Sequence, residues 1–194
     1  LPIDVTPIFF ELDGNFPNHP SNPLMPESQE AITKKVLEIG ADLGVIFDGA
    51  ADRLFFVDDK GNFIRADITL LLLAKLLLEK NPGAGVAYNV ICSRMVREKI
   101  KEWGGVPLRA AVGFVNVANA MRENSGVMGG ELSGHYSFRE NGYADSGFIA
   151  FLIILQMISE SGKKLSEILE PLRKYAKGDE VNFPLESLPS GKVI

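Results

Sequence analysis

Short apolar runs alternate with longer stretches of helical periodicity along the 194 residues of the chain. The short runs are rich in β-branched and aromatic residues, whereas the longer stretches repeat apolar residues every three to four positions. This alternation is typical of an α/β fold. The pattern predicts strands near 3–10, 43–47, 54–58, 85–90, 106–110, 127–130 and 136–139. It predicts helices at 27–39, 67–80, 92–103, 115–123, 144–160 and 165–175.

Terminal signals and polar breaks divide this pattern. Pro26 precedes an acidic first turn and Gly40 follows the last apolar position, as at the two ends of a helix. We expect the Pro- and Asn-rich segment 12–26 to be an ordered loop. A polar, hairpin-like break at 59–66 marks a boundary before a long apolar helix, and a second break lies at 176–180.

Composition narrows the class of protein. The chain is 46% apolar with a net charge of −5 and no basic stripe, which argues against a nucleic acid or an anionic membrane as partner. The single cysteine, Cys92, excludes an internal disulfide and favours the cytoplasm. The apolar runs 68–78 and 148–158 are eleven residues each, well short of the roughly 20 that cross a bilayer. The chain opens on a strand pattern without the features of a signal peptide, so we expect it to begin within a larger architecture.

The first candidate site is the acidic loop inside "GVIFDGAADRLFFV", residues 44–57. Asp48 and Asp52 lie four residues apart, and carboxylates on alternate residues of a tight loop can converge on Mg²⁺, which prefers oxygen ligands. The residue midway between them is Ala50, so two carboxylates remain where three would complete such a pattern. The spacing alone fits a metal loop, a weakened metal loop, or a simple turn with solvated aspartates.

The second candidate site is "GGELSGHYSF", residues 129–138. Glu131, Ser133 and His135 stand on alternate positions, so an extended segment would point all three side chains the same way. A carboxylate that accepts from two vicinal hydroxyls, beside a hydroxyl and an imidazole, can distinguish sugar epimers. The alternative is a polar hairpin with a structural histidine.

A third stretch places Ser93 and Arg94 at the start of a helix that follows a strand. A helix N-terminus can hold a phosphate through its free N–H groups, but the pattern favours an ordinary N-cap at Ser93 over a phosphate site. The two histidines do not form a recognisable Ser-His-Asp arrangement, and the sequence contains no dinucleotide-binding or Walker motif.

Three of these segments together resemble the α-D-phosphohexomutase superfamily of phosphomannomutases and phosphoglucomutases. "FDGAADR" at 47–53 is similar to its D-G-D-x-D-R metal loop, and "GGELSGH" at 129–135 is similar to its sugar-specificity loop G-E-x-S-G-H. "FPNHPSNP" at 16–23 resembles its F-P-N-H segment. The resemblance covers essentially the whole chain and implies mixed sheets flanked by helices in layers.

The resemblance also implies a domain division and residue roles. The family has four domains, and residues 1–65 resemble part of the second, residues 66–176 the third, and residues 177–194 the lead into the fourth. Neither the first domain, which carries the phosphoserine, nor the phosphate-gripping loop of the fourth has a counterpart here. We therefore expect this chain alone to be inactive in moving a phosphoryl group between C1 and C6 of a hexose phosphate.

By the same resemblance, each candidate residue has a role. Asp48 and Asp52 would bind Mg²⁺, and Arg53 would line the active site. The sugar hydroxyls would be read by Glu131, Ser133 and His135. Glu131 and Ser133 suit both mannose and glucose, whereas Leu132 stands where members acting on glucosamine usually have Gln.

Three departures from the family pattern change polar site groups to smaller or apolar ones. Ala50 replaces the middle metal aspartate, so we expect weak Mg²⁺ binding. Asn89 and Ile91 stand where many members have Asp-x-Lys or Asp-x-Arg, and Phe114 stands where they have His or Asp. An alternative is therefore a non-catalytic sugar-phosphate-binding or interaction module, or an engineered scaffold derived from the family. Incomplete cover of the sheet in the second domain would favour a homodimer.

Overall fold

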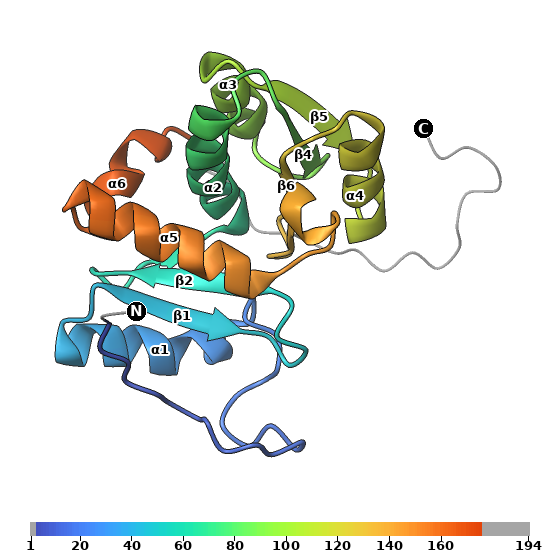
Figure 1. The fold of residues 1–194 in the computed structure, drawn as a ribbon. Helices are drawn as coiled ribbons and strands as arrows, with labels where there is room; N and C mark the ends of the chain where they lie inside the picture. The colour runs from blue at the N-terminus through green and yellow to red at the C-terminus, as the bar shows by residue number, and fades with distance from the viewer. Residues whose placement is uncertain (1–2, 176–194) are drawn as a thin grey trace.

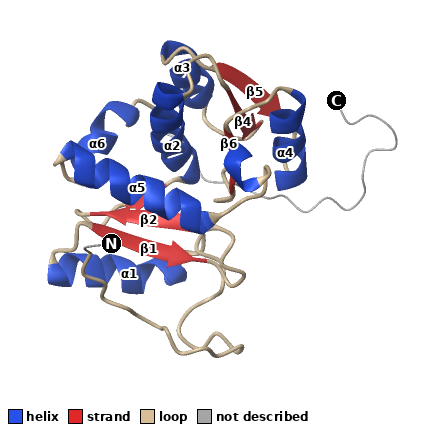
Figure 2. Cartoon of the chain, in the orientation of Figure 1, coloured by secondary structure: helices blue, strands red, loops and turns tan. Residues whose placement is uncertain are grey.

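Two β-sheets with helices packed on them make up the computed structural model, which describes residues 3–175. Figure 1 shows the first sheet between α1 and α5, with the second sheet and its helices beyond α5. Figure 2 shows the loops, which include the segment from residue 3 to α1. The predicted lead into a fourth domain, residues 177–194, lies outside the described residues, as does the break at 176–180. The α/β class predicted from the sequence is confirmed, and both sheets are flanked by helices.

The first sheet is an antiparallel meander in the order β1-β2-β3. Its elements are α1 (Pro26–Ile39), β1 (Leu43–Phe47), β2 (Leu54–Asp58) and β3 (Phe63–Ile64). The helix signals predicted from the sequence are confirmed. Pro26 begins α1, and Gly40 ends it in the left-handed conformation, with its N–H donating to the carbonyl of Val36. Every residue of β2 is buried, since α1 packs on one face of this sheet and α5 on the other (Figure 1).

The second sheet has the order β5-β4-β6-β7. Its strands are β4 (Gly85–Asn89), β5 (Val106–Ala110), β6 (Met128–Gly130) and β7 (Tyr136–Phe138). The first three run parallel, and β7 pairs antiparallel with β6. Parallel strands need crossover connections, and the helices that provide them also cover the sheet. The helices around it are α2 (Ala66–Lys80), α3 (Arg94–Glu102) and α4 (Phe114–Glu123).

Two adjacent glycines of β6 show how closely helices approach both faces of the second sheet. A Cβ built on Gly129 would lie 2.5 Å from Val117 of α4, and one on Gly130 would lie 2.9 Å from Leu70 of α2. Successive residues of a strand face opposite sides of the sheet, so α4 and α2 cover opposite faces. The glycine pair that opens the candidate sugar loop is therefore required by packing.

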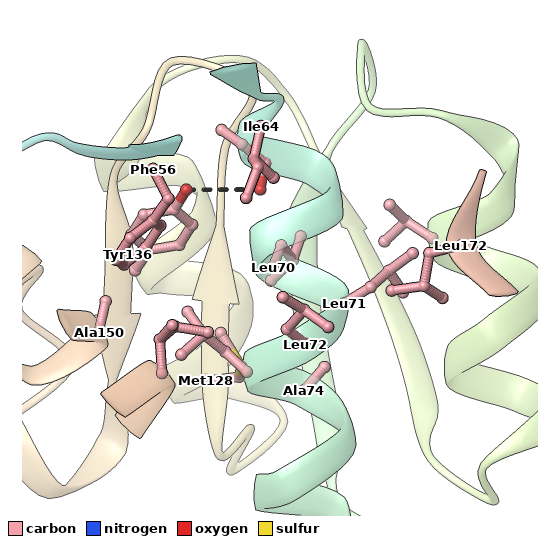
Figure 3. Packing of buried hydrophobic residues seen from close by; sticks show 14 of the residues in the cluster. Phe56, Ile64, Leu70, Leu71, Leu72, Ala74, Met128, Tyr136, Ala150 and Leu172 are labelled. Atoms are coloured by element: carbon pink, nitrogen blue, oxygen red, sulfur yellow. Dashed lines mark hydrogen bonds between the residues drawn. The ribbon is translucent and has the colours of Figure 1, made fainter. Parts of the chain in front are cut away.

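One continuous hydrophobic core includes residues from both sheets. Figure 3 shows Phe56 of β2 against Tyr136 of β7, with the leucines of α2 beside Met128 of β6. Helix α5 (Gly147–Ser161) packs against β2 and α2, so it contributes to the same core. This shared core fixes the loop after β1 relative to the loop after β6. Among residues 3–175, no helix combines the length and the apolar content needed to cross a membrane.

The strand expected at 3–10 is wrong. These residues form no regular strand, and within the described part of the chain they have no hydrogen-bonded ladder partner. Pro7 has no N–H to donate to a ladder, and Phe9 has a φ of 57°, which is incompatible with a strand. Apolar alternation alone therefore misidentified an irregular segment.

The helix expected at 165–175 is shorter than predicted. Helix α6 spans Leu165–Leu169, and a 3-10 turn continues it through Glu170–Leu172. Pro171 explains this end, because proline lacks the N–H that would continue the hydrogen bonds of an α-helix. The other helices and strands predicted from the sequence begin and end within three residues of the observed bounds. A 3-10 turn at Arg139–Asn141 follows β7.

Candidate sugar and metal site

A tight loop joins β1 to β2 and contains the predicted metal residues. The N–H of Asp48 donates to the carbonyl of Arg53 over 3.3 Å, and the N–H of Ala51 donates to the carbonyl of Asp48 over 3.1 Å. Ala51 has a φ of 59°, a conformation that turns the chain sharply. The N–H of Gly49 donates to the carbonyl of Ser21, which attaches the F-P-N-H-like segment to this loop.

The charges of this loop are largely paired within it. The Nε of Arg53 donates to Oδ2 of Asp48 over 2.8 Å, and the backbone N–H of Arg53 donates to Oδ1 over 3.2 Å. Burial raises the pKa of Asp48, but the hydrogen bonds and charge of Arg53, together with a hydrogen bond to Asp52, outweigh this effect and hold the pKa below its usual value. The Asp48 side chain is only 6% exposed, whereas that of Asp52 is 46% exposed. Asp52 is thus the accessible carboxylate of the loop.

The loop from Glu131 to His135 is a turn between β6 and β7, so the extended arrangement expected for this segment is wrong. The N–H of Glu131 donates to the carbonyl of His135 over 3.0 Å, and the N–H of Gly134 donates to the carbonyl of Glu131 over 3.2 Å. Gly134 has a φ of 94°, and a Cβ there would lie 2.6 Å from the ring of Phe55. The three predicted sugar-reading residues therefore project from a turn, with Ser133 half-buried between the other two.

Glu131 is 3% exposed and is held by groups from two neighbouring strand ends. Its Oε1 accepts from Nδ2 of Asn89 over 3.0 Å and from the backbone N–H of Gly113 over 2.9 Å. Asn89 ends β4, and Gly113 precedes α4. The sequence marks Asn89 only as a departure from a family pattern, and its contact with Glu131 cannot be predicted from it.

The two predicted sites meet at the start of β2. The N–H of Leu54 donates to the carbonyl of Gly134 over 3.1 Å, which joins the two loops. The Nδ1 of His135 lies 2.7 Å from Oδ2 of Asp145 and 4.0 Å from Oδ2 of Asp52. One ligand atom from each of Asp52, His135 and Asp145 can be chosen so that all three lie within 4.8 Å of one another.

Asp145 is a further candidate residue, which the sequence motifs do not include. A β-bridge between Ser137 and Asp145 places it beside the hairpin, just before α5. Ser146 then caps α5, with its Oγ accepting from the N–H of Ile149 over 3.2 Å. The sequence offered a weak signal only, an aspartate in front of a capping serine, because the bridge to Ser137 cannot be read from spacing.

Apolar side chains lie beside this cluster. The rings of Phe114 and His135 have centroids 5.8 Å apart. Phe114 is 50% exposed and begins α4, and Ile91, which follows β4, is 44% exposed. Because β4, β5 and β6 run parallel, the residues after them gather at one edge of the sheet, where ligands of α/β proteins usually bind. Ile91 and Phe114, two departures from the family pattern, therefore lie at the sheet edge that carries the candidate sugar loop.

The third candidate, at Ser93, has its polar groups paired. Ser93 caps α3, with its Oγ accepting from the N–H of Met95 over 3.3 Å. Its own N–H donates to Oδ2 of the buried Asp67 over 3.0 Å. Arg94 donates to Glu98 one turn along the helix. The N-cap interpretation fits these contacts.

Two protein-family models match this chain. Residues 65–175 match the family model described as "Phosphoglucomutase/phosphomannomutase, alpha/beta/alpha domain III", and residues 1–61 match the model of domain II. The chain belongs to this family. Membership of the phosphoglucomutase/phosphomannomutase family confirms the resemblance drawn from the three sequence motifs, including the match to the second and third domains.

Individual relatives agree with this assignment. A protein of Xanthomonas campestris pv. campestris described as phosphohexose mutases is 40% identical over 187 residues, which are 96% of this chain and 42% of that protein. The phosphomannomutase of Escherichia coli strain K12 is 35% identical over 185 residues, 95% of this chain and 41% of that protein. The chain thus spans about two fifths of the length of these relatives.

Solved structures share the fold. A phosphoglucomutase/phosphomannomutase family protein from Burkholderia thailandensis has a TM-score of 0.82 at 34% identity, covering 87% of this chain and 37% of that one. The N-acetylphosphoglucosamine mutase of Aspergillus fumigatus, solved with GlcNAc-6P and magnesium, has a TM-score of 0.51 at 16% identity. That match covers 64% of this chain and 32% of that one, and it shows the fold alone.

Proposed function

We propose that this chain forms the hexose-phosphate-binding part of a phosphohexomutase, a protein that moves a phosphoryl group between C1 and C6 of a hexose. In this proposal Glu131, Ser133 and His135 contact the sugar hydroxyls, and Arg53 lines the site. The observation that carries the proposal is the position of Glu131, a buried carboxylate fixed at the sheet edge in a chain that belongs to the phosphoglucomutase/phosphomannomutase family.

The geometry of Glu131 supports the role of a hydroxyl acceptor. Its two hydrogen bonds both fall on Oε1, and within residues 3–175 no hydrogen bond falls on Oε2. A carboxylate held through one oxygen keeps its orientation while the other accepts from a ligand, and such charge-assisted bonds are stronger than neutral ones. Asn89 and the backbone of Gly113 would therefore act by orienting Glu131.

Magnesium fits the loop of residues 48–53 poorly. Both oxygens of Asp48 accept from Arg53, and Ala50, midway between the two aspartates in the sequence, carries a methyl group and no ligand atom. Mg²⁺ requires near-octahedral oxygen ligands at about 2.0–2.1 Å, and this loop offers one accessible carboxylate, that of Asp52. We therefore propose that Asp48 and Asp52 bind Mg²⁺ weakly at most.

Conversion of the hexose phosphate would require a longer protein than these 194 residues. The matched family models describe domains II and III, and the chain spans about two fifths of its relatives. We propose that residues 1–194 by themselves bind a hexose phosphate without converting it. The predicted division into 1–65, 66–176 and 177–194 stays part of this proposal, as does a cytoplasmic location.

Isothermal titration with mannose 1-phosphate and glucose 1-phosphate tests the proposal. We expect binding by the 194-residue chain, and a loss of at least about tenfold in affinity in Glu131→Gln, because the amide replaces the charged acceptor. Glu140→Gln is the matched control, since Glu140 lies in the same hairpin region with its side chain 85% exposed. Absence of binding in a folded sample, or equal binding by both variants, would contradict the proposal.

A second candidate is a non-catalytic binding or interaction module, favoured by the exposed Ile91 and Phe114 beside the sugar loop. Such a module would bind the sugar phosphate, but the whole protein would lack mutase activity. A mutase assay on the full-length protein separates the two candidates.

The proposed homodimer has a separate support. Phe10 and Leu12 are strongly exposed apolar residues, and β1 is an edge strand in the described part of the chain. A monomer at every concentration in light scattering would count against the dimer.

A further inference from the structure

We propose that Asp52, His135 and Asp145 form a binding site for a divalent transition-metal ion such as Zn²⁺ or Co²⁺, in place of a magnesium site on the loop of residues 48–53. The proposal stands on the geometry of these three residues and does not depend on sugar binding.

The ligand atoms are close enough to share one ion. The Nδ1 of His135 lies 2.7 Å from an oxygen of Asp145 and 4.0 Å from an oxygen of Asp52, and all three ligand atoms lie within 4.8 Å of one another. Ligands at about 2.0–2.2 Å from a tetrahedral ion are about 3.4 Å apart. Small side-chain rotations would therefore bring the three atoms around one ion.

Three separate segments hold these residues in place. Asp52 comes from the loop between β1 and β2, which the bond from Leu54 to Gly134 joins to the loop of His135. Asp145 is fixed by its bridge to Ser137. The side chains of His135 and Asp145 are 17% and 20% exposed, so they are largely removed from water. Such preorganisation reduces the cost of gathering the ligands.

The loop of residues 48–53 offers few free ligand atoms, which explains why the ion would not bind to this loop alone. Asp48 is 6% exposed and its two oxygens accept from Arg53, while Ala50 offers no ligand atom. Asp52 is the exposed carboxylate of that loop and lies near His135. The accessible carboxylate of the loop, that of Asp52, thus lies where the loop meets the hairpin of β6 and β7.

The chemistry of the ligands selects the ion. An imidazole nitrogen with carboxylates suits Zn²⁺ and Co²⁺, whereas Mg²⁺ prefers oxygen ligands and retains its waters. The histidine would bind as the tautomer with its proton on Nε2, so the present Nδ1 hydrogen bond to Asp145 would be replaced by two metal bonds. Three protein ligands leave a position for water or a ligand oxygen. The Nε2–H of His135 would remain able to donate to a hydroxyl.

Titration of the 194-residue chain with Co²⁺, followed by calorimetry and visible absorption, tests this site. We expect one ion per chain, bound at least about tenfold more tightly than Mg²⁺, with Zn²⁺ displacing it. His135→Gln and Asp145→Asn should each weaken Co²⁺ binding by more than about tenfold, since even residues that only support a ligand have effects of this size. His19→Gln controls for the other histidine, which lies in the loop before α1, and should leave binding unchanged.

The Asp48→Asn variant separates this site from a site on the loop. We expect Asp48→Asn to retain Co²⁺ binding, because Asp48 is outside the proposed ligand set. Near-ultraviolet circular dichroism confirms that each variant is folded, and the near-isosteric Asp145→Asn gives a test if His135→Gln does not fold. The proposal is overturned if the folded chain binds no Co²⁺, if binding survives both His135→Gln and Asp145→Asn, or if Asp48→Asn alone abolishes it.

Discussion

The loop after β1 and the loop after β6 meet at one edge of the molecule, yet they are held in different ways. In the first loop, Asp48 pairs with Arg53, five positions along the chain, so its charge is satisfied locally. In the second, Glu131 accepts from Asn89 and Gly113, which are 42 and 18 positions away. The first loop is stabilised mainly by its own residues, and the second depends on the sheet around it.

This difference has a consequence for ligand binding. A carboxylate whose two oxygens are already used has little capacity for another cation, whereas a carboxylate held through one oxygen can still accept from a ligand. Asp48 is the first kind and Glu131 is the second. The two loops therefore retain different parts of the chemistry that the family motifs imply.

The largest effect should come from Gly134, where the two loops are joined. Gly134→Ala would place a Cβ 2.6 Å from the ring of Phe55 at a residue with a φ of 94°. Backbone strain of about 1–2 kcal/mol and overpacking of about 1–3 kcal/mol should lower the free energy of unfolding by about 2–5 kcal/mol. Urea denaturation of the Gly134→Ala variant and the unmodified chain at neutral pH measures this loss of stability.

Gly83→Ala is the matched control for that experiment. Gly83 also has a positive φ, of 79°, but a Cβ there would have no neighbour within 4 Å. It should therefore show the backbone strain alone, about 1–2 kcal/mol. Equal losses in the two variants would mean that the close contact between Gly134 and Phe55 contributes nothing.

A smaller effect is expected from the ion pair of the first loop. Arg53→Ala would leave the nearly buried carboxylate of Asp48 without its charged partner. Loss of a charged hydrogen bond should reduce the free energy of unfolding by about 1.5–3 kcal/mol. Urea denaturation of Arg53→Ala, with the exposed pair variant Arg94→Ala as control, measures this. If Arg53→Ala changes stability no more than Arg94→Ala does, the first loop is not held by its own charges.

The sequence predicted what depends on local patterns and missed what depends on distant contacts. Helix α1 was predicted because Pro26 and Gly40 are terminal signals in the chain itself. The strand at 3–10 was wrong, because a strand requires a partner that alternation cannot reveal. The roles of Asn89 and Asp145 come from strand pairing, so neither contact could be read from spacing. The expected roles of Asp48, Asp52, Arg53, Glu131, Ser133 and His135 remain predictions.

Restoring the missing carboxylate would test whether the first loop can recover metal binding. Ala50→Asp adds an oxygen ligand and a negative charge between Asp48 and Asp52, and we expect Mg²⁺ affinity to rise by about tenfold, or about 1.4 kcal/mol. Calorimetric titration with Mg²⁺ measures this, and Ala51→Asp is a control for charge alone. No gain in Ala50→Asp over Ala51→Asp would show that position 50 is not a ligand position.

The smallest effect is the pH dependence of the first loop. Burial raises the pKa of Asp48, but Arg53 lowers it more, so the folded-state pKa lies below the unfolded value. The stabilisation by this group is therefore fully present above the unfolded pKa of about 3.9 and is lost as pH falls through the folded-state pKa. Without Arg53 the folded-state pKa rises, so the acid-induced loss of stability should be smaller in Arg53→Ala than in the unmodified chain. If the pH profiles of the unfolding free energy of the two proteins differ only by a constant, Arg53 does not lower the pKa of Asp48. The first loop would then, like the second, depend on the surrounding sheet.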